Sequence, residues 1–226
     1  MSTDPVTVLV DAVLGPPGPD RIAAAVEALD RSEPDHLAFG GWRALLLLDD
    51  VVNAVGDGPW ARRTAGLRRR SFAAGAVAGR RAGEVSGALA AAGIPHVVTG
   101  ELALTLRYPR PGDRPVHGIT VVTDQARRRV AAVLGAAGLP VIRFGRRSLR
   151  ADVDGLRLLV HRGWPGAPTE PIAADPDPPG HPPFPVATPG AEARRIARPP
   201  LDPDGPADRL DLAALVGTLP EPHLSG

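Results

Sequence analysis

The chain has 226 residues, 43% of them hydrophobic and only 4% aromatic, so it can form one sizeable core built mainly from Ala, Val and Leu. Its 26 basic residues are all arginine, and the net charge of +1 provides no global field for nucleic acid. Cysteine is absent, which excludes disulfides, thiolate nucleophiles and zinc–thiolate sites.

The N-terminal stretch MSTDPVTVLVDAVLGPPG carries acidic residues and early prolines, and it lacks the basic segment that precedes the apolar run of a secretory signal. No apolar run approaches the ~18 residues of a membrane span. We therefore expect a cytoplasmic location and no membrane partner.

Residues 1–92 are expected to form a helical region, because apolar side chains recur at helical spacing, most clearly from Trp60 to Ala92. Glycines recur every four residues along this last helix, at Gly75, Gly79, Gly83 and Gly87. Each one costs helix stability, and the spacing places them on one face. Such a face leaves room for a close partner helix, and we interpret the segment as a helix packed tightly against another part of the chain.

Residues 93–164 alternate between strand and helix patterns, which predicts an α/β core with a mixed sheet. Strands are expected over 94–98, 117–123, 139–145 and 156–161. Helices are expected over 100–108 and 124–138, the second capped by Asp124 and ended by Gly138. The D-x-D formed by Asp152 and Asp154 stands directly before Gly155, which predicts a hairpin turn rather than a metal site.

The segment 165–206 is rich in proline, which removes hydrogen-bond donors and disfavours regular structure. We expect it to be extended or disordered, or to lie as a strap over the surface. Residues 207–226 form the last segment, and 207–219 have the pattern of a closing amphipathic helix.

The order of elements in 93–164 resembles a family of largely uncharacterised bacterial nucleotidyltransferases. The family pattern is a strand leading into "KG", a helix ending in "lY", a loop, the strand "RPmsDiDllV" and a later strand "vDlHw". Here Thr99-Gly100 stands at "KG", Leu106-Arg107-Tyr108 at the helix end and Arg114–Val122 at the aspartate strand without a gap. Leu158–His161 matches the later strand. The resemblance implies an α+β fold, with a helical N-terminal region, a nucleotidyltransferase-like mixed sheet with flanking helices, and a Pro-rich C-terminal tail.

The resemblance also implies magnesium and a nucleotide as cofactors. Nucleotidyl transfer gathers charge on phosphate oxygens, so carboxylates hold two metal ions beside them. An Asp-x-Asp on a strand directs both carboxylates to one face, because side chains alternate with a period of two. A glycine at the start of the preceding helix lets backbone N–H groups approach the phosphates.

This chain departs from the family at each charged position of that site. Gly118 and Thr120 stand where the two strand aspartates would be, and Leu159 stands where the third would be. Thr99 replaces the lysine, and Glu101 places a negative charge beside the expected phosphate. Glycine and leucine have no ligating atom, and a neutral hydroxyl is a poor replacement for a carboxylate. We therefore predict that no metal is bound and that metal-dependent nucleotidyl transfer is lost.

Some polar groups of the cleft remain. Gly100, Arg114 and Thr120 are the candidate ligand-binding residues, and an ion pair that orders the loop is an equally good reading of Arg114. Glu101, His117 and His161 are the candidate acid–base groups if other chemistry is retained. A metal site formed by His96, His117 and His161 is disfavoured, because solitary strand histidines usually satisfy local hydrogen bonds.

Three hypotheses follow. The first is a degenerate nucleotidyltransferase-fold protein that acts as a binding, accessory or regulatory protein, with a protein or small-molecule partner. The second is an enzyme of altered, metal-independent chemistry in the same cleft. The third is a helical interaction module, which a structure without neighbouring strands at 117–123 and 156–161 would favour.

Overall fold

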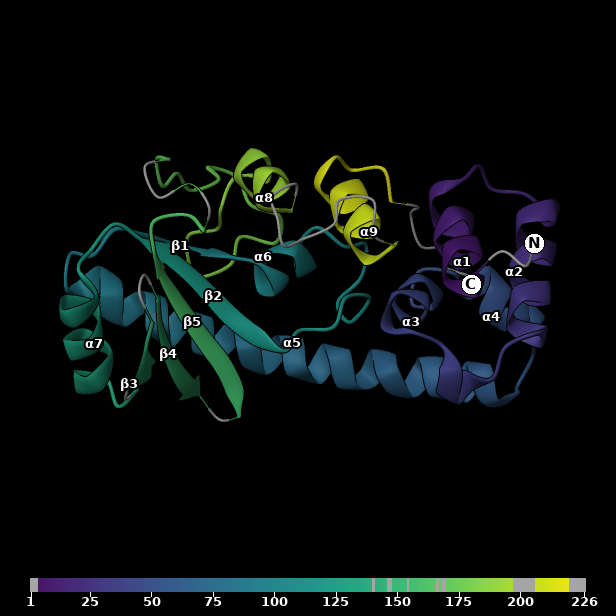
Figure 1. Ribbon diagram of the computed structural model, residues 1–226, viewed down its shortest axis with the longest axis horizontal. Helices are drawn as coiled ribbons and strands as arrows, with labels where there is room; N and C mark the ends of the chain where they lie inside the picture. Colours follow the sequence, from purple (N-terminus) through teal and green to yellow (C-terminus); the bar gives the residue numbers. More distant parts are fainter. Residues whose placement is uncertain are drawn as a thin grey trace.

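Helix α5 (Pro59–Ala91) runs along the length of the elongated molecule in the computed structural model, with helices packed on one end and a sheet on the other (Figure 1). Its 33 residues span about 50 Å. The structure describes residues 4–139, 141–145, 148–153, 155–165, 167, 170–196 and 206–219. Within these ranges, no helix combines the length and the apolar character that crossing a membrane requires.

The helices at one end share an apolar core. They are α1 (Pro5–Leu14), α2 (Pro19–Asp30), α3 (Phe39–Leu45) and α4 (Asp49–Ala54). The short 3-10 helix η1 (Pro34–His36) lies between α2 and α3 in the chain and has no buried residue. The Asp4 carboxylate caps α1 by accepting a hydrogen bond from the Thr7 amide at 3.2 Å. Helix α9 (Pro206–Leu215) adds the buried Leu210 to the same core. The predicted helical N-terminal region is confirmed.

The sheet at the other end has the strand order β1-β2-β5-β4-β3. Its strands are β1 (His96–Thr99), β2 (Gly118–Thr123), β3 (Val141–Phe144), β4 (Ser148–Val153) and β5 (Leu156–Arg162). Strand β2 is parallel to β5, and the remaining pairs are antiparallel. The predicted α+β class with a mixed sheet is therefore confirmed.

One face of the sheet packs against α5 and α7 (Arg127–Ala136). Alternate residues of each strand supply this apolar face, as the two-residue period of a strand requires. The buried strand residues include Val98, Ile119, Val121, Leu149, Leu158 and Val160. Val85 and Leu89 of α5 and Leu134 of α7 pack against them. The opposite face carries the positions that the resemblance assigns to chemistry.

Several sequence predictions need correction. Strand β4 was not predicted, because one arginine and one aspartate separate its buried residues Leu149, Ala151 and Val153. Helix α7 begins at Arg127 without a side-chain cap, and the Asp124 carboxylate instead accepts a hydrogen bond from the Gln125 side chain at 3.0 Å. By contrast, the interpretation of Asp152 as a turn residue is confirmed, since its carboxylate accepts a hydrogen bond from the Gly155 amide at 2.9 Å. Asp154 lies outside the described residues.

The glycine face of α5 does not pack against another helix in the described part of the chain. A Cβ added at Gly75, Gly79 or Gly87 would meet nothing within 4 Å, and one at Gly83 would meet the ring of Pro183 at 3.5 Å. The partner helix for which this face leaves room is therefore not found among the described residues. What lies over this helix at Gly83 is the Pro-rich C-terminal segment.

The described part of that segment forms a strap, residues 170–196, that lies along β1. Val98 donates a hydrogen bond to the Pro185 carbonyl at 2.7 Å, and its own carbonyl accepts from Ala187 at 2.9 Å. An ion pair between Arg107 and Asp175 holds the strap near α6 (Glu101–Thr105). The strap ends in the short helix α8 (Pro189–Ile196), which the proline content of its surroundings concealed at the sequence level.

Candidate functional site

The three positions that the resemblance assigns to carboxylates lie together on the sheet face opposite the core. Thr120 pairs with Leu159 on β5 and with Thr99 on β1, and Gly118 pairs with Arg157. Residues directly opposite one another in paired strands direct their side chains to the same face. Thr99, Thr120 and Leu159 therefore form a row across β1, β2 and β5, with Gly118 beside it.

This row lacks the donors that a magnesium site needs. It offers hydroxyl groups and an isobutyl group, whereas magnesium is held through carboxylates. Gly118 also has no space for a side chain, because a Cβ there would lie 2.6 Å from the carbonyl oxygen of Arg157. Among the described residues, no three His, Asp or Glu side chains gather where they could hold a metal ion. The donor set therefore does not fit the family's metals.

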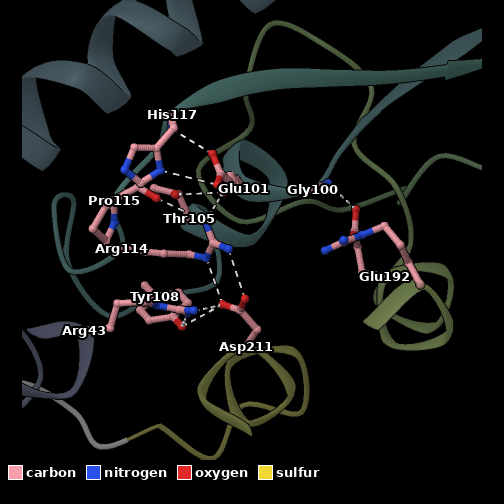
Figure 2. Close-up of polar contacts among 11 residues, drawn as sticks. Arg43, Gly100, Glu101, Thr105, Tyr108, Arg114, Pro115, His117, Glu192 and Asp211 are labelled. Carbon is pink, nitrogen blue, oxygen red and sulfur yellow. Dashed lines mark hydrogen bonds and ion pairs between the residues drawn. The ribbon is translucent and has the colours of Figure 1, made fainter. Parts of the chain in front are cut away.

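A carboxylate from the strap fills the turn between β1 and α6. The Gly100 amide donates to Oε1 of Glu192 at 2.9 Å (Figure 2). The Thr99 hydroxyl donates to the same oxygen. Oε2 of Glu192 accepts from Nε of Arg195 at 2.7 Å, and Glu192 is only 2% exposed. Gly100 adopts φ +73°, a conformation that favours glycine. The resemblance implies that the Gly100 N–H group contacts a phosphate, but here this group donates to Glu192 of the same chain.

Glu101 and His117 lie together at the entrance to β2. Oε2 of Glu101 accepts the backbone N–H of His117 at 2.7 Å, and Oε1 lies 3.4 Å from the ring Nδ1 (Figure 2). The His117 ring is largely exposed and makes an edge contact with Phe39 at 5.7 Å between ring centroids. The Glu101 carboxylate thus holds the start of β2 rather than the Gly100 turn.

His161 lies apart from that pair. It pairs with Val122 near the far end of β2, whereas His117 precedes the first residue of the same strand. Burial lowers the pKa of His161, so the imidazole is neutral at neutral pH. His96 is buried elsewhere, with its ring nitrogens 2.5 Å from the Ser86 hydroxyl and 2.8 Å from the Ile94 carbonyl. The histidines therefore do not converge.

Arg114 belongs to a buried ionic cluster. Its Nε and Nη2 donate to the two carboxylate oxygens of Asp211 on α9, at 2.8 and 3.0 Å. The same carboxylate accepts from the Tyr108 hydroxyl at 2.8 Å and from Nη2 of Arg43 at 2.5 Å (Figure 2). Arg114 Nη1 donates to the backbone carbonyls of Glu101 and Pro115, both at 3.2 Å. The arginine thus ties the approach to β2 to α6 and α9.

The charges of this cluster depend on one another. Burial alone would raise the pKa of Asp211, but the Arg114 and Arg43 guanidinium groups and the Tyr108 hydroxyl hold it at about 2. Burial raises the pKa of Tyr108, so its hydroxyl stays protonated and continues to donate. At neutral pH the cluster therefore contains one carboxylate between two guanidinium groups.

Sequence reasoning missed Glu192 and Asp211, the two acidic residues that bond to the candidate site. Each lies more than 90 residues from its partner, Glu192 from Gly100 and Asp211 from Arg114. Both fall outside the part of the chain that the resemblance covers. Neither belongs to a motif, so only the tertiary structure identifies them.

Comparison with known proteins gives limited results. No family model matches the chain, and no curated protein matches it. Solved structures of the antibiotic-resistance factor ANT(2'')-Ia are similar to it. The solution structure has 15% identity and a TM-score of 0.44, and the match covers 58% of this chain and 78% of the ANT(2'')-Ia chain. The crystal structure with adenylyl-2''-tobramycin has 16% identity and a TM-score of 0.43, and the match covers 58% of this chain and 83% of the ANT(2'')-Ia chain. Similarity at this level assigns neither family nor activity.

Proposed function

We propose that this protein is a nucleotidyltransferase-like protein that has lost metal-dependent nucleotidyl transfer and acts as a binding, accessory or regulatory protein. The main support is the row of Thr99, Thr120 and Leu159 with Gly118 beside it. The positions expected to hold carboxylates are Gly118, Thr120 and Leu159, and none of these residues has a carboxylate. Two-metal transfer needs charged oxygens at that place to neutralise the developing phosphate charge.

The packing around Gly118 supports a site that has diverged beyond single substitutions. The Arg157 carbonyl oxygen occupies the space that any side chain at position 118 would need. An aspartate could return there only if β2 and β5 moved apart. The spacing between the β2 and β5 backbones therefore leaves no room for an aspartate side chain at position 118.

The Glu192 contact supports the loss of triphosphate binding at the Gly100 turn. An incoming phosphate would have to displace a buried carboxylate that accepts two hydrogen bonds and is ion-paired with Arg195. Hydrogen bonds to a charged group contribute about 1.5–3 kcal/mol each, so this displacement has a substantial cost. A triphosphate without bridging metal ions has little to offset that cost.

A second candidate, metal-independent chemistry, is favoured by the exposed pair of Glu101 and His117. A carboxylate that touches the Nδ1 side of an exposed imidazole is an arrangement that can orient a general base. The third hypothesis, a plain helical module, loses its basis because β2 and β5 are neighbours in a mixed sheet.

A transfer assay tests the proposal. Purified full-length protein is incubated with Mg²⁺ and each nucleoside triphosphate labelled at the α-phosphate, with a small-molecule cell extract as the source of acceptors. We expect no labelled product and no pyrophosphate above the protein-free control. The loss of transfer would be contradicted if magnesium-dependent labelling activity co-eluted with the folded protein on size exclusion.

A further inference from the structure

A groove of about 550 Å³ lies between α5, α6 and the prolines of the strap, away from the row of Thr99, Thr120 and Leu159. None of those three residues lines it. Its walls include Phe72, Gly75, Gly79 and Arg80 of α5, together with Leu102 and Phe184. Its volume falls within the range of about 300–1,000 Å³ found for small-molecule sites.

The groove is formed by fixed apolar walls and a bare stretch of helix. Leu102 and Phe184 are 3% and 6% exposed, so both are held by the core. Gly75 and Gly79 supply no side chain, and a Cβ at either position would meet nothing within 4 Å. Phe72 is 55% exposed at the same groove, which leaves a large apolar ring in water. Burying that ring against a ligand is favourable by the hydrophobic effect.

One polar side chain of the groove is available to a ligand. The Thr105 hydroxyl lines it but donates to the Glu101 carbonyl, and the Tyr108 hydroxyl donates to Asp211. The exposed Arg80 also lines it, and no described residue forms a hydrogen bond or ion pair with its guanidinium. A guanidinium recognises carboxylate-type anions through paired hydrogen bonds.

We propose that this groove binds a small amphipathic molecule with a flat apolar body and one anionic group. The apolar body lies over Gly75 and Gly79 beside Phe72, and the anion pairs with Arg80. The glycine repeat of α5 then leaves space for a ligand rather than for a helix. This inference holds whether or not nucleotidyl transfer is lost.

The test uses anilinonaphthalene sulfonate, an aromatic probe with one sulfonate, titrated into the full-length protein and followed by fluorescence. We expect saturable binding of one probe per chain. Gly79→Leu places a side chain in the groove and should weaken binding about tenfold or more. Gly87→Leu is the matched control, because its Cβ is equally open on the same helix but lies outside the groove, and it should bind within about twofold of wild type.

Arg80→Gln removes the charge at an exposed position and keeps the fold, so it tests the anion contact separately. It should weaken the sulfonate probe about fivefold to tenfold and leave the uncharged analogue phenylnaphthylamine unchanged. Absence of saturable binding to the wild type overturns the proposal, as does a Gly79→Leu affinity within twofold of wild type. Equal losses in the Gly79→Leu and Gly87→Leu variants would also overturn it, because the probe would then report loosened structure. The anion contact would be overturned if the Arg80→Gln substitution weakened the binding of both probes to the same extent.

Discussion

The buried carboxylate of Asp211 is the best place to test the reasoning quantitatively. Asp211→Asn keeps the shape of the side chain but removes the negative charge between the Arg43 and Arg114 guanidinium groups. Asp211 is 3% exposed and receives hydrogen bonds from both arginines and from Tyr108. Without it, the Arg114 and Arg43 guanidinium groups lose the buried carboxylate that they share.

The expected cost of the substitution at neutral pH is about 3–5 kcal/mol, which is the range for removing one partner of a buried ion pair. The pKa of Asp211 gives a second prediction, because the folded value of about 2 lies below the ordinary value of an aspartate carboxyl, 3.8. A depression of this size corresponds to about 2 kcal/mol of stability. Because the folded pKa is lowered, that stability is present above about pH 4 and is lost as the pH falls through 2.

The assay is urea unfolding followed by circular dichroism, at pH 7 and then at steps down to pH 3. The matched control is Asp11→Asn, because the Asp11 carboxylate accepts from Arg209 of the same helix α9 at 2.8 Å but lies on the surface. The control should lose less than about 1 kcal/mol. The reasoning is refuted if Asp211→Asn unfolds within 1 kcal/mol of wild type at pH 7. It is also refuted if the variant loses stability in acid as steeply as the wild type does.

Three further predictions use the same unfolding measurement or a simple proteolysis experiment. Gly118→Ala should destabilise by about 1–3 kcal/mol, because its Cβ meets the Arg157 carbonyl, whereas Gly135→Ala in the open part of α7 should stabilise by up to about 1 kcal/mol. Equal effects would mean that β2 and β5 have room at position 118. Glu192→Ala removes the acceptor of two donors in the Gly100 turn, so trypsin should cleave the arginines of α8 faster than in wild type. An unchanged cleavage rate would show that the carboxylate does not hold α8. His117→Ala changes an exposed ring and should stay within about 0.5 kcal/mol of wild type, and a larger loss would assign the ring a structural role.

Local patterns made much of the fold predictable from the sequence. The strand–helix alternation after residue 93 and the helical spacing before it depend on neighbours along the chain, and both are confirmed. Gly138 ends α7 as expected, with φ +76°. Strand β4 was missed because its outward positions carry charge, which hides an alternating pattern of buried residues.

The contacts that determine the state of the candidate site could not be predicted. Glu192 reaches the Gly100 turn from a helix within a proline-rich segment, and Asp211 reaches Arg114 from the last described helix. A local pattern carries no information about partners so far apart in sequence. The same limit explains the glycine face of α5. The spacing places the glycines on one face, but only the fold shows that Pro183 of the strap lies nearest to Gly83.

Calorimetric titration of the wild-type protein with the four nucleoside triphosphates, with and without Mg²⁺, tests the central claim most directly. Because the row of Thr99, Thr120 and Leu159 provides no carboxylate and Glu192 fills the Gly100 turn, we predict dissociation constants weaker than about 1 mM in both conditions. A magnesium-dependent dissociation constant in the micromolar range for any of the four would contradict the account.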